Sequence, residues 1–407
     1  MSGPMEGVRI VELASWTFVP AAGAVFADWG ADVIKIEDVG AGDPARALVI
    51  AGLTRDKAKA DREFMLEINN RGKRSVGLNL RSEFGRAAFA KLIESADVFL
   101  TNWLPEARRR LGVDVEHVRA INPDIIYARG SGHGPVGPDA EKGGYDAASY
   151  MARGGVAYAL TPAGAERPID QTPAFGDLPG GMTLAGGIAA ALYKRKATGE
   201  TSVVDVSLLS QAIWTMGPDI MAAELFGVDR TAPAAGEKRP MNPVVAKYRT
   251  RDDRWLQLVF LQPDRYWEAF TKRIGRPELS ADPRFVPAAN LIANAAEAEA
   301  ELARTFAEHD YDHWLTTLAD EEGVWSAVAS PLEVLSDQQA EANGYFVVNT
   351  DDAGVEYKLP ASPVRFDQTQ PAPARSPEHG EQTELVLLDL GYDWDAIAAA
   401  KESGSIV

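Results

Sequence analysis

The feature that most constrains the fold is a repeated alternation of short β-branched segments with segments of helical periodicity. Val8–Leu13 and Asp32–Ile36 are strand-like, and Pro20–Trp29 between them is predicted to be a helix that starts with Pro and ends before Gly30. Such alternation predicts an α/β fold with a parallel sheet covered by helices on both faces. The pattern continues, with strands and helices expected in turn, through Arg74–Leu80, Ser82–Ala96, Asp97–Asn102, Val113–Ile121, Asp124–Ser131, Leu178–Lys196 and Val203–Val206.

A chain of 407 residues exceeds what one hydrophobic core usually supports, so we expect two domains. A Pro-rich segment, Ala232–Pro243, is typical of a connection between them. The smaller domain is expected to be α+β, with a strand at Arg254–Leu261 and helices at Tyr266–Arg273 and Ala295–Leu318, and Glu384–Ser403 is expected to be the last helix. The predicted parts are a large domain over 1–206, a linker over 207–242, the small domain over 243–330, a linker over 331–350, and the rest of the large domain over 351–407.

Charge and composition exclude several classes of function. The chain has 41 Lys and Arg against 59 Asp and Glu, and the net charge of -18 argues against nucleic acid as a general partner. With no cysteine it cannot form a disulfide, a thiolate nucleophile or a cysteine-type zinc site. Neither a signal peptide nor a membrane-spanning run is apparent, so a cytoplasmic location is expected. A nucleophile would have to be Ser, Thr, Lys, Asp or Glu.

Two further motifs have the spacing of a dinucleotide-binding loop and of a metal site. Gly132–Gly137 matches the glycine spacing of a dinucleotide-binding loop, but Pro135 and Pro138 make a helix after it improbable, so a glycine-rich loop is the favoured interpretation. A nicotinamide dehydrogenase remains an alternative function only if this loop binds NAD. His309 and His313 are spaced to share one helical face, but the surrounding sequence is that of a solvated surface, and no metal is predicted.

The segment Phe175–Met182 is the most informative, because it places Asp177 where a loop enters a helix. A carboxylate there commonly caps the helix, and the free amides and helix dipole would favour its ionised form. The surrounding glycines leave the carboxylate unshielded, so a ligand could also reach it. These residues alone leave two roles for Asp177, a helix cap and a reactive carboxylate.

The sequence resembles the class III CoA-transferase family, which includes formyl-CoA and carnitine CoA-transferases and α-methylacyl-CoA racemases. The shared order of the matching blocks across nearly the whole chain makes the resemblance specific. The blocks are Gly7–Glu12, Gly30–Glu37, Gly42–Arg46, Asn70–Val76, Ala96–Trp103, Asn122–Tyr127, Gly176–Asp177, Leu359–Pro360 and Ser362–Val364.

The resemblance implies that Asp177 is a nucleophile, which forms an acyl anhydride and then an aspartyl-CoA thioester while CoA passes from an acyl-CoA to a carboxylic acid. The amides of Gly180 and Gly181 are candidates for stabilising the oxyanions. Acyl-CoA is then a substrate, and no tightly bound cofactor is expected. The positions that match the family's CoA contacts are Thr17, Leu78, Arg81, Asn102, Trp103, Leu104, Arg110, Tyr145 and Asp146.

Three departures from the family pattern refine this interpretation. Asp38 stands where many relatives have an arginine near adenine, so adenine recognition is expected to differ. Tyr145 stands where the racemases have a histidine base, which favours transfer over racemisation, because an ordinary tyrosine is a weak base at neutral pH. Phe260–Asp264 lacks the glycines of the formyl-CoA transferase loop, so a different acid is expected.

The resemblance also implies an interlocked homodimer, with each active site between the large domain of one subunit and the small domain of its partner. An acyl-CoA racemase or epimerase and a non-catalytic CoA-binding protein remain as alternatives. The pair of acids cannot be inferred from the sequence.

Overall fold

The computed structural model describes residues 3–229, 242–369, 371–372 and 374–407, which form two compact units. Unit 1 comprises the described residues of Met1–Thr161, Glu166–Thr231 and Gln339–Val407, and unit 2 those of Pro162–Ala165 and Ala232–Gln338. Residues 230–241 lie outside the described residues, and they include most of the predicted Pro-rich connection. The other expected linker, 331–350, contains two short helices, α14 (Pro331–Val334) and α15 (Gln338–Ala342), and ends in a strand.

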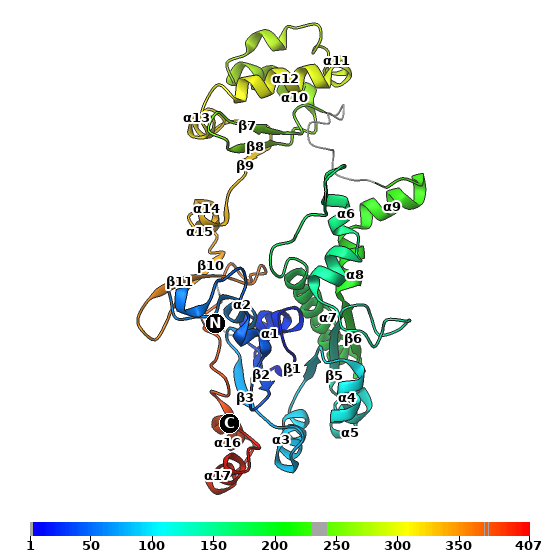
Figure 1. The fold of residues 1–407 in the computed structure, drawn as a ribbon, viewed down its shortest axis with the longest axis vertical. Coiled ribbons are helices and arrows are strands. Elements are labelled where there is room, and N and C mark those ends of the chain that lie inside the picture. The colour runs from blue at the N-terminus through cyan, green and yellow to red at the C-terminus, as the bar shows by residue number, and fades with distance from the viewer. Residues whose placement is uncertain (1–2, 230–241, 370, 373) are drawn as a thin grey trace. The chain divides into compact units, whose positions relative to one another are not determined.

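Unit 1 is built on a six-stranded sheet in the order β3-β2-β1-β4-β5-β6, and every pair is parallel (Figure 1). The predicted α/β fold with a parallel sheet is confirmed. The strand order reverses between β1 and β4, which is the arrangement that opens a crevice at the carboxyl ends of the strands. The strands are β1 (Arg9–Leu13), β2 (Asp32–Glu37), β3 (Arg74–Gly77), β4 (Val98–Thr101), β5 (Ile126–Ser131) and β6 (Val203–Ser207).

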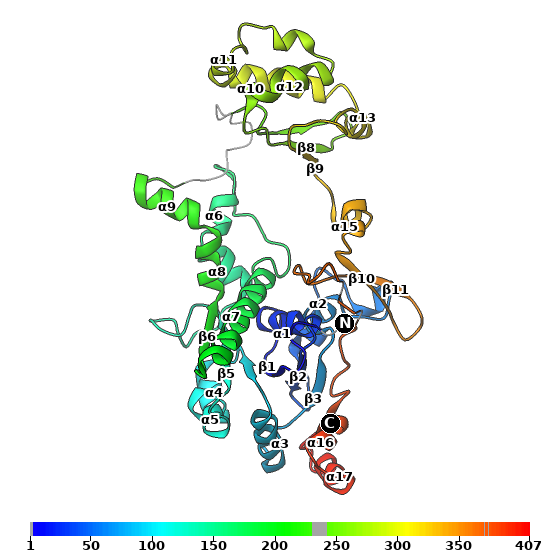
Figure 2. The same ribbon diagram turned by 180° about the vertical axis from the view of Figure 1, so that it is seen from behind.

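Helices cover both faces of this sheet because its strands carry apolar side chains on both faces. One core joins the sheet to α1 (Phe18–Asp28), α7 (Asp177–Thr198) and α8 (Leu208–Thr215). The opposite core joins it to α3 (Glu83–Glu94), α5 (Val115–Ile121), α16 (Thr383–Asp389) and α17 (Trp394–Glu402), the last two drawn in red in Figure 2. The other elements of unit 1 are α2 (Phe64–Asn70), α4 (Pro105–Leu111), α6 (Val156–Leu160), α9 (Gly217–Phe226), and a hairpin of β10 (Phe346–Thr350) and β11 (Glu356–Pro360).

Local signals explain where several helices begin and end. Ser82 caps α3 as predicted, its hydroxyl accepting a hydrogen bond from the Gly85 amide. The single helix predicted over Glu384–Ser403 is wrong: the chain turns at Gly391, whose φ is +82°, and Asp393 caps α17 anew. The segment 140–176, which precedes α7, contains a π-helical turn at Ala147–Ala152 as well as α6.

Unit 2 has a three-stranded antiparallel sheet of β7 (Lys247–Arg249), β8 (Trp255–Leu258) and β9 (Trp325–Ala327) with its own apolar core. Its helices are α10 (Pro263–Arg273), α11 (Ala288–Ala293), α12 (Ala295–Phe306) and α13 (Tyr311–Thr317). The single helix predicted over Ala295–Leu318 is wrong, since the chain turns after Phe306 so that Trp314 packs on the Phe306 ring and donates its indole N–H to the Phe306 carbonyl. In the described part of the chain, no helix is long and apolar enough to cross a membrane.

Candidate active site

A pocket of about 500 Å³ opens in unit 1 at the point where the strand order reverses. Its walls come from the segments that follow three parallel strands: Ser15–Phe18 after β1, Asn102–Pro105 after β4, and Ser131–Pro135 after β5. Carboxyl ends of parallel strands meet at one edge of a sheet, and this edge is where α/β proteins bind ligands. Asp177, the first residue of α7, contributes a carboxylate to the same pocket.

Asp177 does not cap its helix. Gly176 occupies the N-cap position, and no side-chain capping bond is made there. Gly176 has no room for a side chain, because an added Cβ would lie 2.3 Å from the Tyr150 ring and 2.6 Å from a carboxylate oxygen of Asp146. The close approach of Tyr150 and Asp146 therefore requires glycine beside Asp177 and fixes the backbone that presents its carboxylate.

The pKa of Asp177 is raised from its ordinary value of 3.8 to about 7, chiefly by burial and further by the neighbouring carboxylate of Asp146. The expectation that the helix terminus would favour the ionised form is wrong in sign, because loss of solvent outweighs the helix dipole at this position. Burial also raises the pKa of Asp146, whose Oδ2 accepts a hydrogen bond of 2.9 Å from the Gly176 amide. A carboxyl group in a pocket whose pKa lies near neutral pH is typical of a reactive site.

The two glycines proposed as oxyanion donors have another role. The Gly180 amide donates within the helix, to the Gly176 carbonyl at 3.0 Å, so it is not free to stabilise an oxyanion. An added Cβ at Gly180 would lie 2.7 Å from the Phe18 ring, and one at Gly181 2.7 Å from the Ala21 Cβ. These glycines allow α7 to pack directly against α1, which places Asp177 over the end of β1.

The structure brings five of the predicted contact residues to the pocket, and they lie with Asp177. They are Thr17, Asn102, Trp103, Leu104 and Tyr145. The Asn102 side chain is engaged with the backbone of Ser15, its Oδ1 accepting from the Ser15 amide at 3.1 Å and its Nδ2 donating to the Ser15 carbonyl at 2.7 Å. Asn102 therefore shapes the pocket through the turn after β1.

The remaining predicted contacts lie outside the pocket walls. Asp146 lies behind Asp177 and holds the Gly176 amide. Leu78 is buried after β3, where it forms a β-bridge with Ile406, and Arg81 is exposed nearby. Arg110 is exposed on α4.

Sequence reasoning missed several residues that line the pocket. Arg108 and Arg109 both do so, and Arg108 is held by hydrogen bonds to the Trp103 carbonyl at 2.7 Å and to Asp114 at 3.2 Å. Arg109 pairs with Glu141 at 3.2 Å. The run of three arginines was a usable signal, but only the helix phase decides which of them face the pocket. Trp16 was also missed, and nothing in its sequence context indicates its place.

The glycine-rich segment Gly132–Gly137 is a loop and opens no helix, in agreement with the favoured interpretation. Gly132 packs against Gly144, with its added Cβ only 2.6 Å from the Gly144 Cα, so both positions bring two backbone segments together at the pocket rim. In unit 2, His309 and His313 stack with ring centroids 4.0 Å apart. Among the described residues, no group of three or more His, Asp or Glu is arranged to hold a metal.

Comparison with known proteins finds relatives over nearly the whole chain. Residues 5–383 match the model of CoA-transferase family III. The chain is 33% identical over 402 residues to the (R)-2-hydroxy-4-methylpentanoate CoA-transferase of Clostridioides difficile, covering 98% of each chain. It is 32% identical to the cinnamoyl-CoA:phenyllactate CoA-transferase of Clostridium sporogenes, over 99% of this chain and 97% of that one. A crystal structure of a CAIB/BAIF family protein from Brucella suis superposes with a TM-score of 0.80 at 26% identity, covering 96% of this chain and all of that chain.

Proposed function

Because the chain belongs to CoA-transferase family III, we propose that it moves coenzyme A from an acyl-CoA donor to a carboxylic acid through covalent intermediates on Asp177. The observation that carries the proposal is the place of this carboxylate. It lies in the pocket at the strand-order reversal, it caps no helix, and its pKa is raised to about 7. Acyl-CoA is a substrate in this scheme and not a resident cofactor.

The proposed reaction begins with an oxygen of ionised Asp177 attacking the thioester carbonyl carbon of the donor. The carbon–sulfur bond breaks, CoA leaves as the thiolate, and an acyl-aspartyl anhydride remains. The thiolate then attacks the aspartyl carbonyl carbon, which releases the donor acid and forms the aspartyl-CoA thioester. The acceptor carboxylate attacks this thioester and expels the thiolate, and thiolate attack on the acceptor's carbonyl carbon yields the new acyl-CoA and regenerates Asp177.

Two arginine side chains among the charged residues of the pocket wall support binding of an anionic thioester to an acidic protein. Arg108 and Arg109 are candidates for phosphate contacts, since guanidinium groups suit phosphate geometry. Arg81 and Arg110 remain proposed contacts for parts of CoA that extend beyond the pocket. The raised pKa of Asp177 supports its role as the attacking group, because a carboxylate that is less stable as an anion is a better nucleophile.

The relatives support a candidate substrate class. The two named above act, by their names, on (R)-2-hydroxy-4-methylpentanoate and on phenyllactate, and both acids are 2-hydroxycarboxylates with an apolar side chain. We propose the same class here, with one such acid as the acceptor and its CoA thioester as the product.

The proposal includes a cytoplasmic, interlocked homodimer. Apolar side chains exposed on α8 and α9 support a subunit contact, since Trp214 is 82% and Phe226 74% exposed. Light scattering on the purified protein tests the state, and a monomer at micromolar concentration would contradict this part of the proposal.

The mechanism is tested by mass spectrometry of the protein after incubation with 2-hydroxy-4-methylpentanoyl-CoA or cinnamoyl-CoA. We expect a CoA adduct on the peptide that contains Asp177, its removal by hydroxylamine, and no adduct or transfer in Asp177→Ala. A stable adduct on another residue, or full activity in Asp177→Ala, would overturn the mechanism. The control is Asp170→Ala, which removes an exposed carboxylate from the preceding loop and should leave the adduct unchanged.

A further inference from the structure

The turn that follows β1 is held from both neighbouring strands. On the β4 side, Asn102 bonds both backbone groups of Ser15. On the β2 side, the Trp16 amide donates to Oδ1 of Asp43 at 3.1 Å. Ser15, Trp16 and Thr17 all line the pocket, so these two side chains clamp one of its walls.

Trp16 has an unusual backbone that this clamp must maintain. Its φ is +69°, in the left-handed region that favours glycine and that a bulky residue occupies only when its surroundings impose it. The indole meets the Tyr145 ring edge-on, with the planes at 90° and the centroids 5.8 Å apart. Trp16 and Tyr145 thus form an aromatic wall with a right-angled corner in the pocket that contains Asp177.

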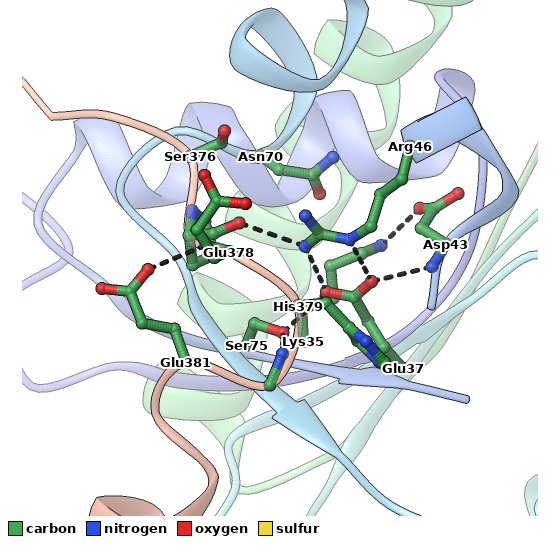
Figure 3. A network of polar contacts seen from close by, with 12 residues as sticks. Lys35, Glu37, Asp43, Arg46, Asn70, Ser75, Ser376, Glu378, His379 and Glu381 are labelled. Atoms are coloured by element: carbon green, nitrogen blue, oxygen red, sulfur yellow. Dashed lines mark hydrogen bonds and ion pairs between the residues drawn. The ribbon is translucent and has the colours of Figure 1, made fainter. Parts of the chain in front are cut away.

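Asp43 is itself fixed by a buried lysine. It is only 2% exposed, and Oδ2 lies 2.9 Å from the Lys35 ammonium. Figure 3 shows this ion pair. The ammonium also contacts Oε1 of Glu12 at 3.1 Å and the Ala14 carbonyl at 2.7 Å, and Glu12 and Lys35 are register partners on β1 and β2. Lys35 on β2 therefore links the end of β1 to the loop that contains Asp43.

The loop that contains Asp43 is fastened to the end of β2 by Glu37. Glu37 accepts hydrogen bonds from the Asp43 amide at 2.7 Å and from two nitrogens of Arg46 at 2.7 and 2.8 Å, and the Ser75 hydroxyl donates to it at 2.6 Å (Figure 3). Asp43 therefore cannot shift without breaking this network. Oδ1 of Asp43 also accepts from the Ala45 amide at 2.9 Å and so caps the turn Pro44–Ala47. The same oxygen reaches the strained Trp16 amide, which capping its own loop does not require.

We propose that Asp43 is a positioning residue that acts through Trp16. It holds the Trp16 backbone so that the indole, with Tyr145, forms the wall against which the acyl side chain of the thioester packs. The inference rests on the proposed function and deepens it, because an aromatic wall favours donors and acceptors with apolar side chains over small polar acids.

The test is a cycle of Asp43→Asn, Trp16→Gly and the double variant, with KM and kcat measured for 2-hydroxy-4-methylpentanoyl-CoA and for acetyl-CoA. Trp16→Gly removes the ring but suits the left-handed backbone. We expect each single variant to raise KM for the branched thioester about tenfold, with kcat changed less than about threefold and little change for acetyl-CoA. Because Asp43 acts through Trp16, the double variant should be no worse than either single variant.

The matched control is Asp56→Asn in the same connection between β2 and α2, where the exposed carboxylate accepts a hydrogen bond from the Thr54 hydroxyl. It should leave both constants unchanged. Independent additive effects in the cycle, or an unchanged KM in Asp43→Asn, would overturn the inference. If Asp43→Asn does not fold, Trp16→Gly and Trp16→Phe decide alone, and an unchanged KM in both would overturn it.

A spectroscopic measurement separates this inference from the proposed function. The fluorescence and near-ultraviolet dichroism of Trp16 are obtained as the difference between spectra with and without Trp16→Phe, since the chain has nine tryptophans. Asp43→Asn should change this difference spectrum, whereas Asp56→Asn should not. A wild-type protein that transfers no CoA would overturn the proposed function, and an unchanged difference spectrum would overturn the inference.

Discussion

Replacing Asp177 by Asn should make the protein inactive and, at neutral to alkaline pH, more stable. The folded pKa of Asp177 is raised from 3.8 to about 7, so its stabilising effect as a neutral acid is present below pH 4 and is lost as the pH rises through 7. Between about pH 5 and 7 the unfolded chain has lost this proton while the folded chain retains it. The slope is about 1.4 kcal/mol per pH unit, which gives an upper limit of about 3 kcal/mol between pH 5 and 7.

The expected difference is smaller because Asp177 faces an open pocket and water screens its charge. We therefore expect the stability of Asp177→Asn relative to the wild type to increase by about 1 kcal/mol from about pH 5 to 8. Urea unfolding at several pH values, followed by tryptophan fluorescence, measures it. Asp170→Asn is the control, because it removes a carboxylate that is 78% exposed and should show no such increase. A difference between Asp177→Asn and wild type that does not change with pH would refute the burial argument.

Four further predictions concern activity and stability. The wild-type kcat/KM should fall about tenfold per pH unit below pH 7 and level off above it, since Asp177 must be ionised to attack, and a profile flat down to pH 5 would contradict this. Gly176→Ala should lower kcat about 10- to 100-fold, because its methyl group would collide with the Tyr150 ring, and an unchanged kcat would show that the backbone there can shift freely. Lys35→Met should cost about 3 to 5 kcal/mol in urea unfolding, because the buried Asp43 carboxylate would lose its cation while Glu12 kept only Lys73, and a loss below 1 kcal/mol would argue against the ion pair. Ile188→Ala should cost about 2 to 5 kcal/mol with kcat retained, since this side chain is fully buried between α7 and the sheet.

Much of unit 1 was predictable because its signals are local. The β-branched runs, Ser82 as a cap and Gly30 as a terminator each act within a few residues, and they placed the strands of the sheet to within about three residues. The errors have an equally local cause. Helical periodicity continued through Gly391 and past Phe306, where a left-handed glycine and the packing of Trp314 divide the helix.

The sequence alone predicted that Asp177 lies where a loop enters a helix, and it showed the order of the family blocks. Both depend on residues that are adjacent in sequence. The direction of its pKa shift, the engagement of the Gly180 amide and the contact of Asp43 with Trp16 required the folded molecule. Each depends on burial and on atoms that are distant in sequence, brought together where β1, β2 and β4 end. Periodicity reports which face of an element is buried, whereas the neighbours of one carboxylate are decided only when the strands pair in their final order.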